Sequence, residues 1–101
     1  MPDPSSSPPI HARRCHVSGR VQGVYYRATT RQKAAELGVT GYARNLPDGR
    51  VEVLAVGTPE QVRSLIEWLW IGSATSHVTD VEVEELDPQR LVGLPSGFAT
   101  R

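Results

Sequence analysis

Alternating apolar and polar residues predict β-strands at both ends of this chain and in its middle. Between residues 11 and 18, Arg13, Cys15 and Val17 fall on one face of a strand. The even-numbered residues 12–18 fall on the other face. Between residues 78 and 85, valine alternates with acidic residues, which indicates a strand with one face in solvent. The other candidate strands are Val39–Leu46 and Arg50–Val56, which flank the hairpin signal Pro47-Asp48-Gly49, and the short edge stretch Gly97–Arg101.

Helical spacing of apolar residues predicts two helices. The first runs from Tyr26 to Leu37, and Gly38 ends it as a residue in the left-handed region. The second begins after Thr58, where a capping box with Gln61 and a proline at the first helical position coincide. Trp68 lies off its apolar stripe, so we expect Trp68 to be partly exposed. The stripe residues are Tyr26, Thr30, Ala34 and Leu37 in the first helix, and Val62, Leu65, Ile66, Leu69 and Trp70 in the second, which Gly72 ends.

The order of these elements is β-α-β-β-α-β, with a short fifth strand expected at 97–101. This order predicts an α+β protein, a ferredoxin-like α/β sandwich with two helices on one face of an antiparallel sheet. Residues 1–10 are rich in proline and serine and predict a disordered lead-in, so the folded domain is expected to span residues 11–101. Many unrelated activities use this fold, so the function has to come from the site.

Composition argues against several classes of partner. Eleven basic and eleven acidic residues cancel, so there is no overall positive field to hold nucleic acid or an anionic membrane. No apolar run approaches the roughly 20 residues that span a bilayer. Residues 1–9 lack the apolar stretch of a secretory signal. Cys15 is the single cysteine and has no disulfide partner within the chain, which favours a reducing, cytoplasmic location.

The segment from residue 19 to residue 27 carries the strongest chemical signal. It is expected to leave a strand through a glycine-flanked loop and to enter a helix directly. Such a junction points several backbone N–H groups at one spot, beside the positive end of the helix dipole. A cation at this helix end is disfavoured by about 0.3–1 kcal/mol unless an anion is bound. The segment therefore predicts a phosphate cradle, and it reads Gly19-Arg20-Val21-Gln22-Gly23-Val24-Tyr25-Tyr26-Arg27.

A second segment, Gly41-Tyr42-Ala43-Arg44-Asn45-Leu46-Pro47-Asp48-Gly49, follows after one helix. Together the two segments resemble the signatures of the acylphosphatase family, G-x-V-Q-G-V-x-[FY]-R and G-[YWF]-x-x-N-x-x-D-G. The resemblance extends from about Cys15 to Val83 and again, more loosely, over Gly97–Arg101. It implies hydrolysis of the carboxyl–phosphate bond of a small acyl phosphate, with no metal and no cofactor.

The resemblance also implies a role for each site residue. The N–H groups of roughly Arg20 to Tyr26 hold the phosphate oxygens, and Gly19 and Gly23 give the backbone its freedom. Arg27 pairs with the phosphate, and Asn45 orients the attacking water. From the residues themselves, Gln22 is expected to brace the loop, while Asp48 and Gly49 are turn residues. Tyr25 is a candidate for the acyl side of the pocket.

The residues argue against several other functions. A cysteine phosphatase needs C-x5-R, whereas Cys15 and Arg20 give C-x4-R, so a buried structural thiol is favoured. The histidines show no metal-ligand spacing. An RNA-recognition domain needs stacking aromatics where residues 51–56 are mostly aliphatic.

Two further alternatives remain open. One is a non-catalytic module that binds phosphate or acyl phosphate. Another is the acylphosphatase-like domain of a larger carbamoyl transferase, against which the length of 101 residues argues. We expect a monomer, with weak self-association through Trp68 and Trp70 as an additional hypothesis.

Overall fold

The computed structural model describes residues 9–94 and 96–101, so most of the predicted lead-in lies outside the described residues. The elements confirm the predicted order, and α1 has the predicted bounds. The first strand continues two residues further than predicted, to Arg20. The elements are β1 (His11–Arg20), α1 (Tyr26–Leu37), β2 (Thr40–Asn45), β3 (Val51–Gly57), α2 (Pro59–Ile71), β4 (His77–Leu86), the short 3-10 helix η1 (Pro88–Arg90) and β5 (Phe98–Thr100).

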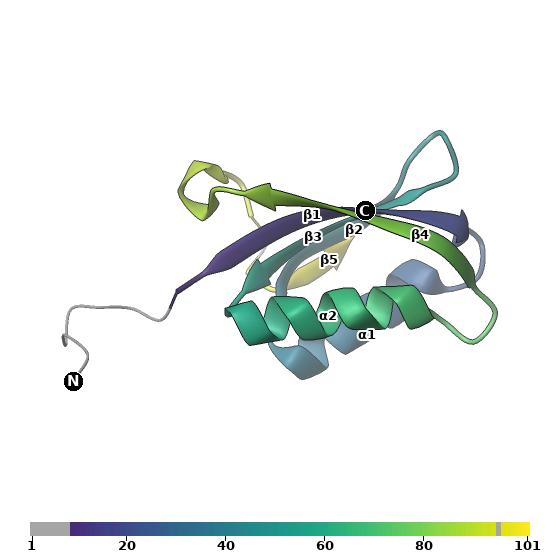
Figure 1. Ribbon diagram of the computed structural model, residues 1–101, viewed down its shortest axis with the longest axis horizontal. Helices are drawn as coiled ribbons and strands as arrows, with labels where there is room; N and C mark the ends of the chain where they lie inside the picture. Colours follow the sequence, from purple (N-terminus) through teal and green to yellow (C-terminus); the bar gives the residue numbers. More distant parts are fainter. Residues whose placement is uncertain (1–8, 95) are drawn as a thin grey trace.

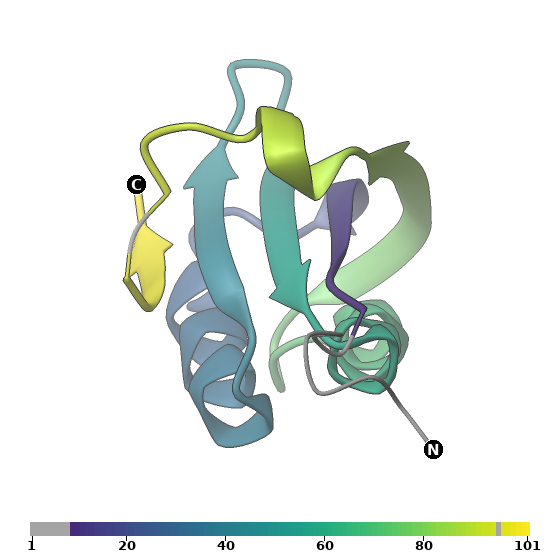
Figure 2. The same cartoon turned by 90° about the vertical axis from the view of Figure 1, so that its left-hand side faces the viewer.

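The five strands form one sheet in the order β4-β1-β3-β2-β5, and both helices cover the same face of it (Figure 1). The first four strands pair antiparallel, as predicted. The fifth strand exists, but it runs parallel to β2, so the sheet is mixed (Figure 2). Since β2 and β4 run in opposite directions, a chain that reverses after β4 and reaches β2 must run parallel to β2. The architecture is the predicted ferredoxin-like sandwich.

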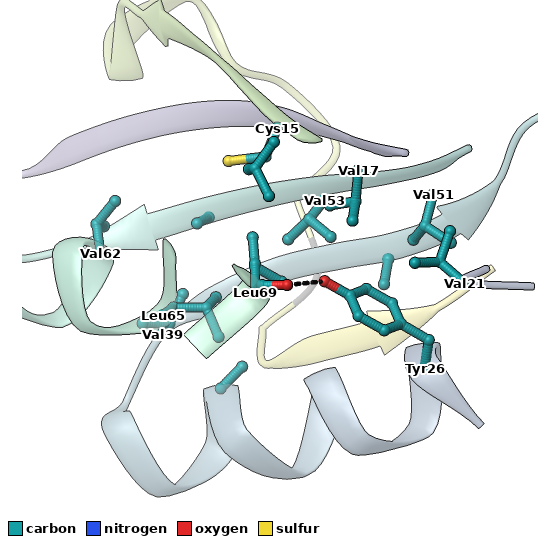
Figure 3. Packing of buried hydrophobic residues seen from close by; sticks show 14 of the residues in the cluster. Cys15, Val17, Val21, Tyr26, Val39, Val51, Val53, Val62, Leu65 and Leu69 are labelled. Atoms are coloured by element: carbon teal, nitrogen blue, oxygen red, sulfur yellow. Dashed lines mark hydrogen bonds between the residues drawn. The ribbon is translucent and has the colours of Figure 1, made fainter. Parts of the chain in front are cut away.

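The core lies between the sheet and the two helices (Figure 3). Cys15 and Val17 project into it from β1, as the alternation predicted, and both are fully buried. Leu65 and Leu69 meet them from α2. Burial raises the pKa of the Cys15 thiol to about 12, so this thiol is neutral at ordinary pH.

The helix ends follow the sequence signals. Gly38 ends α1 with φ 80°, and its N–H group donates to the carbonyl groups of the preceding turn. At the start of α2, the Thr58 hydroxyl accepts from the N–H group of Gln61, and the Gln61 side chain accepts from the N–H group of Thr58. The predicted capping box is therefore formed. Within the described residues, no helix is long and apolar enough to cross a membrane.

The prediction for the two tryptophans was right for Trp68, which is partly exposed, and wrong for Trp70. Trp68 packs against the core, and its ring stacks on that of Tyr26 with the centroids 5.9 Å apart. Trp70, which the stripe placed inside, is 49% exposed. The stripe describes only the part of α2 that faces the sheet. Because α1 packs along the flank of α2, the buried arc of α2 extends toward Trp68 instead of toward Trp70.

The face of the sheet opposite the helices holds a polar cluster around Glu52, whose residue is only 5% exposed. Its carboxylate accepts hydrogen bonds from His16 on β1 at 3.0 Å, and from Tyr42 and Arg44 on β2 at 2.9 and 2.6 Å. Burial alone would raise the pKa of Glu52, but these three hydrogen bonds outweigh it and lower the pKa. The cluster ties three strands together.

Candidate active site

The first two residues of the predicted cradle belong to the end of β1. Gly19 and Arg20 pair with Val78 and His77 of β4, after an irregularity in register at Ser18. A Cβ atom at Gly19 would overlap the carbonyl oxygen of His77, and φ is +120° at this glycine. Gly19 thus allows β4 to approach closely just before the loop begins.

The loop itself is anchored by buried side chains on either side of an exposed turn. Val21 and Val24 are buried, as is Tyr26, the first residue of α1. Between these anchors, Gly23 and Tyr25 both have left-handed backbone conformations, with φ 73° and 60°. The two left-handed residues let the side chains of Val21, Val24 and Tyr26 enter the core while the turn between them stays at the surface.

The loop ends at a helix terminus that has no side-chain cap. Tyr25 is the N-cap residue of α1, and its side chain makes no capping hydrogen bond. The first turn contains no acidic residue, whereas α2 begins with a complete capping box and Glu60. The first N–H groups of a helix have no partner within it. At α1 they are available to an anion.

Loop and helix terminus border a hollow of about 340 Å³. Five of the predicted site residues line it, and Arg27 is among them. The Tyr25 side chain is 82% exposed, so it stands beside the hollow without closing it. The lining residues are Val21, Gly23, Tyr25, Tyr26, Arg27 and Ala28.

Gln22 connects this loop to the turn between β2 and β3. Its side-chain amide donates to the carbonyl oxygens of Leu46 at 2.8 Å and Arg50 at 2.9 Å. The structure therefore confirms that Gln22 braces the loop. Asp48 acts as a turn residue, as expected: its carboxylate accepts from the N–H group of Arg50 at 3.0 Å, a bond that lowers the pKa of Asp48.

Asn45 is the last residue of β2 and directly precedes Leu46, the residue that Gln22 holds. Side chains two apart on a strand share a face, so Asn45 lies on the same face as the buried Ala43, the face covered by the helices. Asn45 is exposed there. Among the described residues, no hydrogen bond occupies its amide group. Asn45 thus lies at the end of β2 nearest the loop, but it is not among the residues that line the hollow.

A contact that the sequence did not predict involves Arg101. Its main-chain oxygen accepts a hydrogen bond of 2.6 Å from Nη1 of Arg27, and its N–H group donates to the carbonyl oxygen of Ala43 at 2.8 Å. The Arg101 guanidinium lies 4.4 Å from the ring centroid of Tyr42. Residues 97–101 were expected to matter only for the fifth strand. It also connects Arg27 to the strand that carries Asn45.

Other candidate chemistries find little support in the described part of the chain. Cys15 is buried in the core and does not line the hollow. Among residues 9–94 and 96–101, no group of three or more His, Cys, Asp or Glu side chains is arranged to hold a metal ion.

Comparison with known proteins decides the family. The family model described as Acylphosphatase matches residues 13–99. This chain belongs to the acylphosphatase family. An acylphosphatase of Halorhodospira halophila is 60% identical over 74 residues, which are 73% of this chain and 80% of that relative.

Solved acylphosphatases share the fold as well as the sequence. The enzyme from Coxiella burnetii is 39% identical with a TM-score of 0.81, covering 91% of this chain and 93% of that one. The enzyme from Bacillus subtilis is 36% identical with a TM-score of 0.82, covering 90% and 98%. Both likenesses extend over nearly the whole of each chain.

Proposed function

We propose that this chain is an acylphosphatase that hydrolyses the carboxyl–phosphate bond of acyl phosphates to a carboxylate and inorganic phosphate. Membership of the acylphosphatase family supports this activity. The observation that carries the assignment of the site is the hollow, where a left-handed loop, an uncapped helix N-terminus and Arg27 come together. An oxyanion is the ligand that all three features favour.

In this proposal the phosphate occupies the hollow. The N–H groups between Arg20 and Tyr26 donate to its oxygens, and Gly19 and Gly23 allow the backbone to turn inward. The Arg27 guanidinium pairs with two phosphate oxygens in a fork geometry that lysine cannot match. The hydrogen bond to Arg101 holds the arginine side chain in place from the other side.

Asn45 then orients the attacking water. Its amide oxygen can accept a hydrogen bond from the water, and its amide nitrogen can donate one to the water oxygen. The water oxygen attacks phosphorus in line, the bond between phosphorus and the acyl oxygen breaks, and the electron pair leaves with the carboxylate. An amide is a poor base, so the water proton passes to a phosphate oxygen. The products are a carboxylate and dihydrogen phosphate, which balance the charge of the dianionic substrate and water.

This chemistry requires neither a metal nor a general acid. The leaving carboxylate has a conjugate acid with a pKa of about 4, so it departs without being protonated. The loose transition state of phosphoryl transfer needs positioning and charge stabilisation, which the loop and Arg27 provide. We infer further that the enzyme works in the reducing cytoplasm, where its single buried cysteine stays a thiol.

The test is hydrolysis of benzoyl phosphate in the presence of EDTA by the wild-type protein and by Asn45→Ala. We expect turnover by the wild type and a loss of about 100-fold in kcat for the variant, because the water is no longer positioned. Competitive inhibition by inorganic phosphate should stay unchanged in Asn45→Ala. Gln32→Ala, which removes another exposed amide, on α1, is the matched control and should behave as wild type.

Two results would contradict the proposal in different ways. A wild-type protein that binds phosphate but turns over no acyl phosphate would be the non-catalytic binding module. Inhibition by EDTA that added metal reverses would refute the metal-free mechanism while leaving the activity itself in place.

A further inference from the structure

Residues 72–76 form the loop between α2 and β4. This loop contacts the proposed phosphate-binding loop, residues 19–26, at Val24. The Ser73 hydroxyl donates a hydrogen bond of 2.9 Å to the carbonyl oxygen of Val24, and the Thr75 hydroxyl reaches the same oxygen at 3.4 Å. The Ser76 hydroxyl stays within the loop and donates to the carbonyl oxygen of Ser73 at 2.8 Å. The Val24 carbonyl group is therefore turned toward this loop and held there.

The direction of that carbonyl group fixes the direction of the next N–H group. In a trans peptide, the carbonyl oxygen of one residue and the N–H group of the next point to opposite sides. The described residues contain no cis peptide bond. The N–H group of Tyr25 therefore points away from residues 72–76. The hollow lies on that side, since Tyr25 lines it and no residue of 72–76 does.

Tyr25 does not hold this orientation by itself. Its φ of 60° lies in the left-handed region, which is unfavourable for a residue with a Cβ atom. Its side chain is 82% exposed, so packing does not fix it either. A flip of the peptide between Val24 and Tyr25 would bring φ of Tyr25 to a favourable negative value. The flip would also turn a carbonyl oxygen, with its negative partial charge, into the hollow.

The neighbouring residue is fastened to the same part of the molecule. The Tyr26 hydroxyl donates to the carbonyl oxygen of Leu69 in the last turn of α2 at 2.8 Å (Figure 3), and its ring stacks on Trp68. The end of α2 and the loop after it thus hold the start of α1 and the peptide before it.

We propose that Ser73 is a positioning residue of the phosphate cradle, with Thr75 as a weaker second donor. Its hydrogen bond to Val24 prevents the peptide flip and keeps the N–H group of Tyr25 directed at the phosphate. The inference rests on the proposed function, because it assigns the hollow to phosphate. Ser73 itself does not line the hollow.

The experiment compares Ser73→Ala with Ser76→Ala in titrations with inorganic phosphate, followed by the 15N–1H signal of Tyr25. Loss of one neutral hydrogen bond predicts phosphate binding weaker by about fivefold in Ser73→Ala. The phosphate-induced shift of the Tyr25 signal should shrink, and KM for benzoyl phosphate should rise more than kcat falls. Ser76→Ala loosens the same loop without removing the Val24 contact and should bind phosphate as wild type does. Ser73→Thr keeps the hydroxyl and should restore binding.

Three results would contradict the role proposed for Ser73. Equal phosphate affinity and an equal Tyr25 shift in Ser73→Ala and wild type would overturn the inference and leave the proposed function standing. An equal loss in Ser76→Ala would overturn the specific contact in favour of general loop integrity. A wild-type protein that binds no phosphate would overturn the proposed function, and the inference with it.

Discussion

Arg27 is the side chain on which phosphate binding should depend most. It lines the hollow at the uncapped start of α1. We expect Arg27→Ala to weaken inhibition by inorganic phosphate by at least about 100-fold, because the two lost charged hydrogen bonds contribute roughly 1.5–3 kcal/mol each. Turnover of benzoyl phosphate should fall with it. Steady-state kinetics with phosphate as a competitive inhibitor measures both effects.

Arg31→Ala is the matched control for this prediction. Arg31 is exposed one turn further along the same helix and does not line the hollow. It removes the same charge, so a purely long-range electrostatic effect would appear in both variants. An Arg27→Ala protein that phosphate inhibits as strongly as wild type would remove Arg27 from the proposed site.

The residues that sequence could predict are those in local motifs. Gly23 and Arg27 lie in one continuous segment, and the loop geometry around them follows from residue type and order. Contacts between distant segments carry no such signal. The oxygen of Arg101 lies 74 residues from Arg27, and the Ser73 hydroxyl lies 49 residues from Val24. Such pairs meet only because the sheet and helices bring them together.

At the scale of elements, Glu52 on β3 joins β1 and β2 across the outer face of the sheet. We expect Glu52→Gln to lower the free energy of unfolding at pH 7 by about 2 kcal/mol, because the charged hydrogen bonds to His16 and Arg44 are lost. Urea unfolding followed by circular dichroism measures the change. Glu84→Gln removes the exposed pair with Arg14 and should cost less than about 1 kcal/mol.

The effect of Glu52→Gln on the free energy of unfolding should also depend on pH. The folded pKa of Glu52 lies below its ordinary value of 4.5, so its contribution to stability is complete above that pH. It is lost as the pH falls through the folded pKa. The difference in unfolding free energy between wild type and Glu52→Gln should therefore shrink from pH 7 to pH 3. A difference that stays constant over this range would show that the carboxylate charge is not what stabilises the strands.

Elements with strong end signals were predictable, and the relations between elements were less so. α1 ends where the sequence indicated, because Gly38 has a left-handed conformation that few other residues adopt. The parallel direction of β5 and the exposure of Trp70 could not be predicted from the sequence. The direction of β5 depends on where the chain returns to the sheet, and the exposure of Trp70 depends on which flank of α2 meets α1.

At the scale of the whole molecule, the end of α2 exposes two adjacent apolar side chains. Trp70 is 49% exposed and Ile71 is 73% exposed. A stable protein interface buries about 800 Å² per partner, whereas a large aromatic side chain offers about 150–250 Å². Two side chains of this size support only a weak association. We therefore expect a monomer at micromolar concentration.

Sedimentation velocity over a range of concentrations tests the hypothesis of weak self-association. The sedimentation coefficient should be that of a monomer at micromolar concentration and should rise only near millimolar concentration. Trp70→Lys should abolish that rise, because it places a charge on the exposed patch. Trp68→Phe should leave the rise unchanged and lower stability instead, since Trp68 is partly buried and stacks on Tyr26. A stable dimer at micromolar concentration, or a rise that survives Trp70→Lys, would place the interface on another part of the surface.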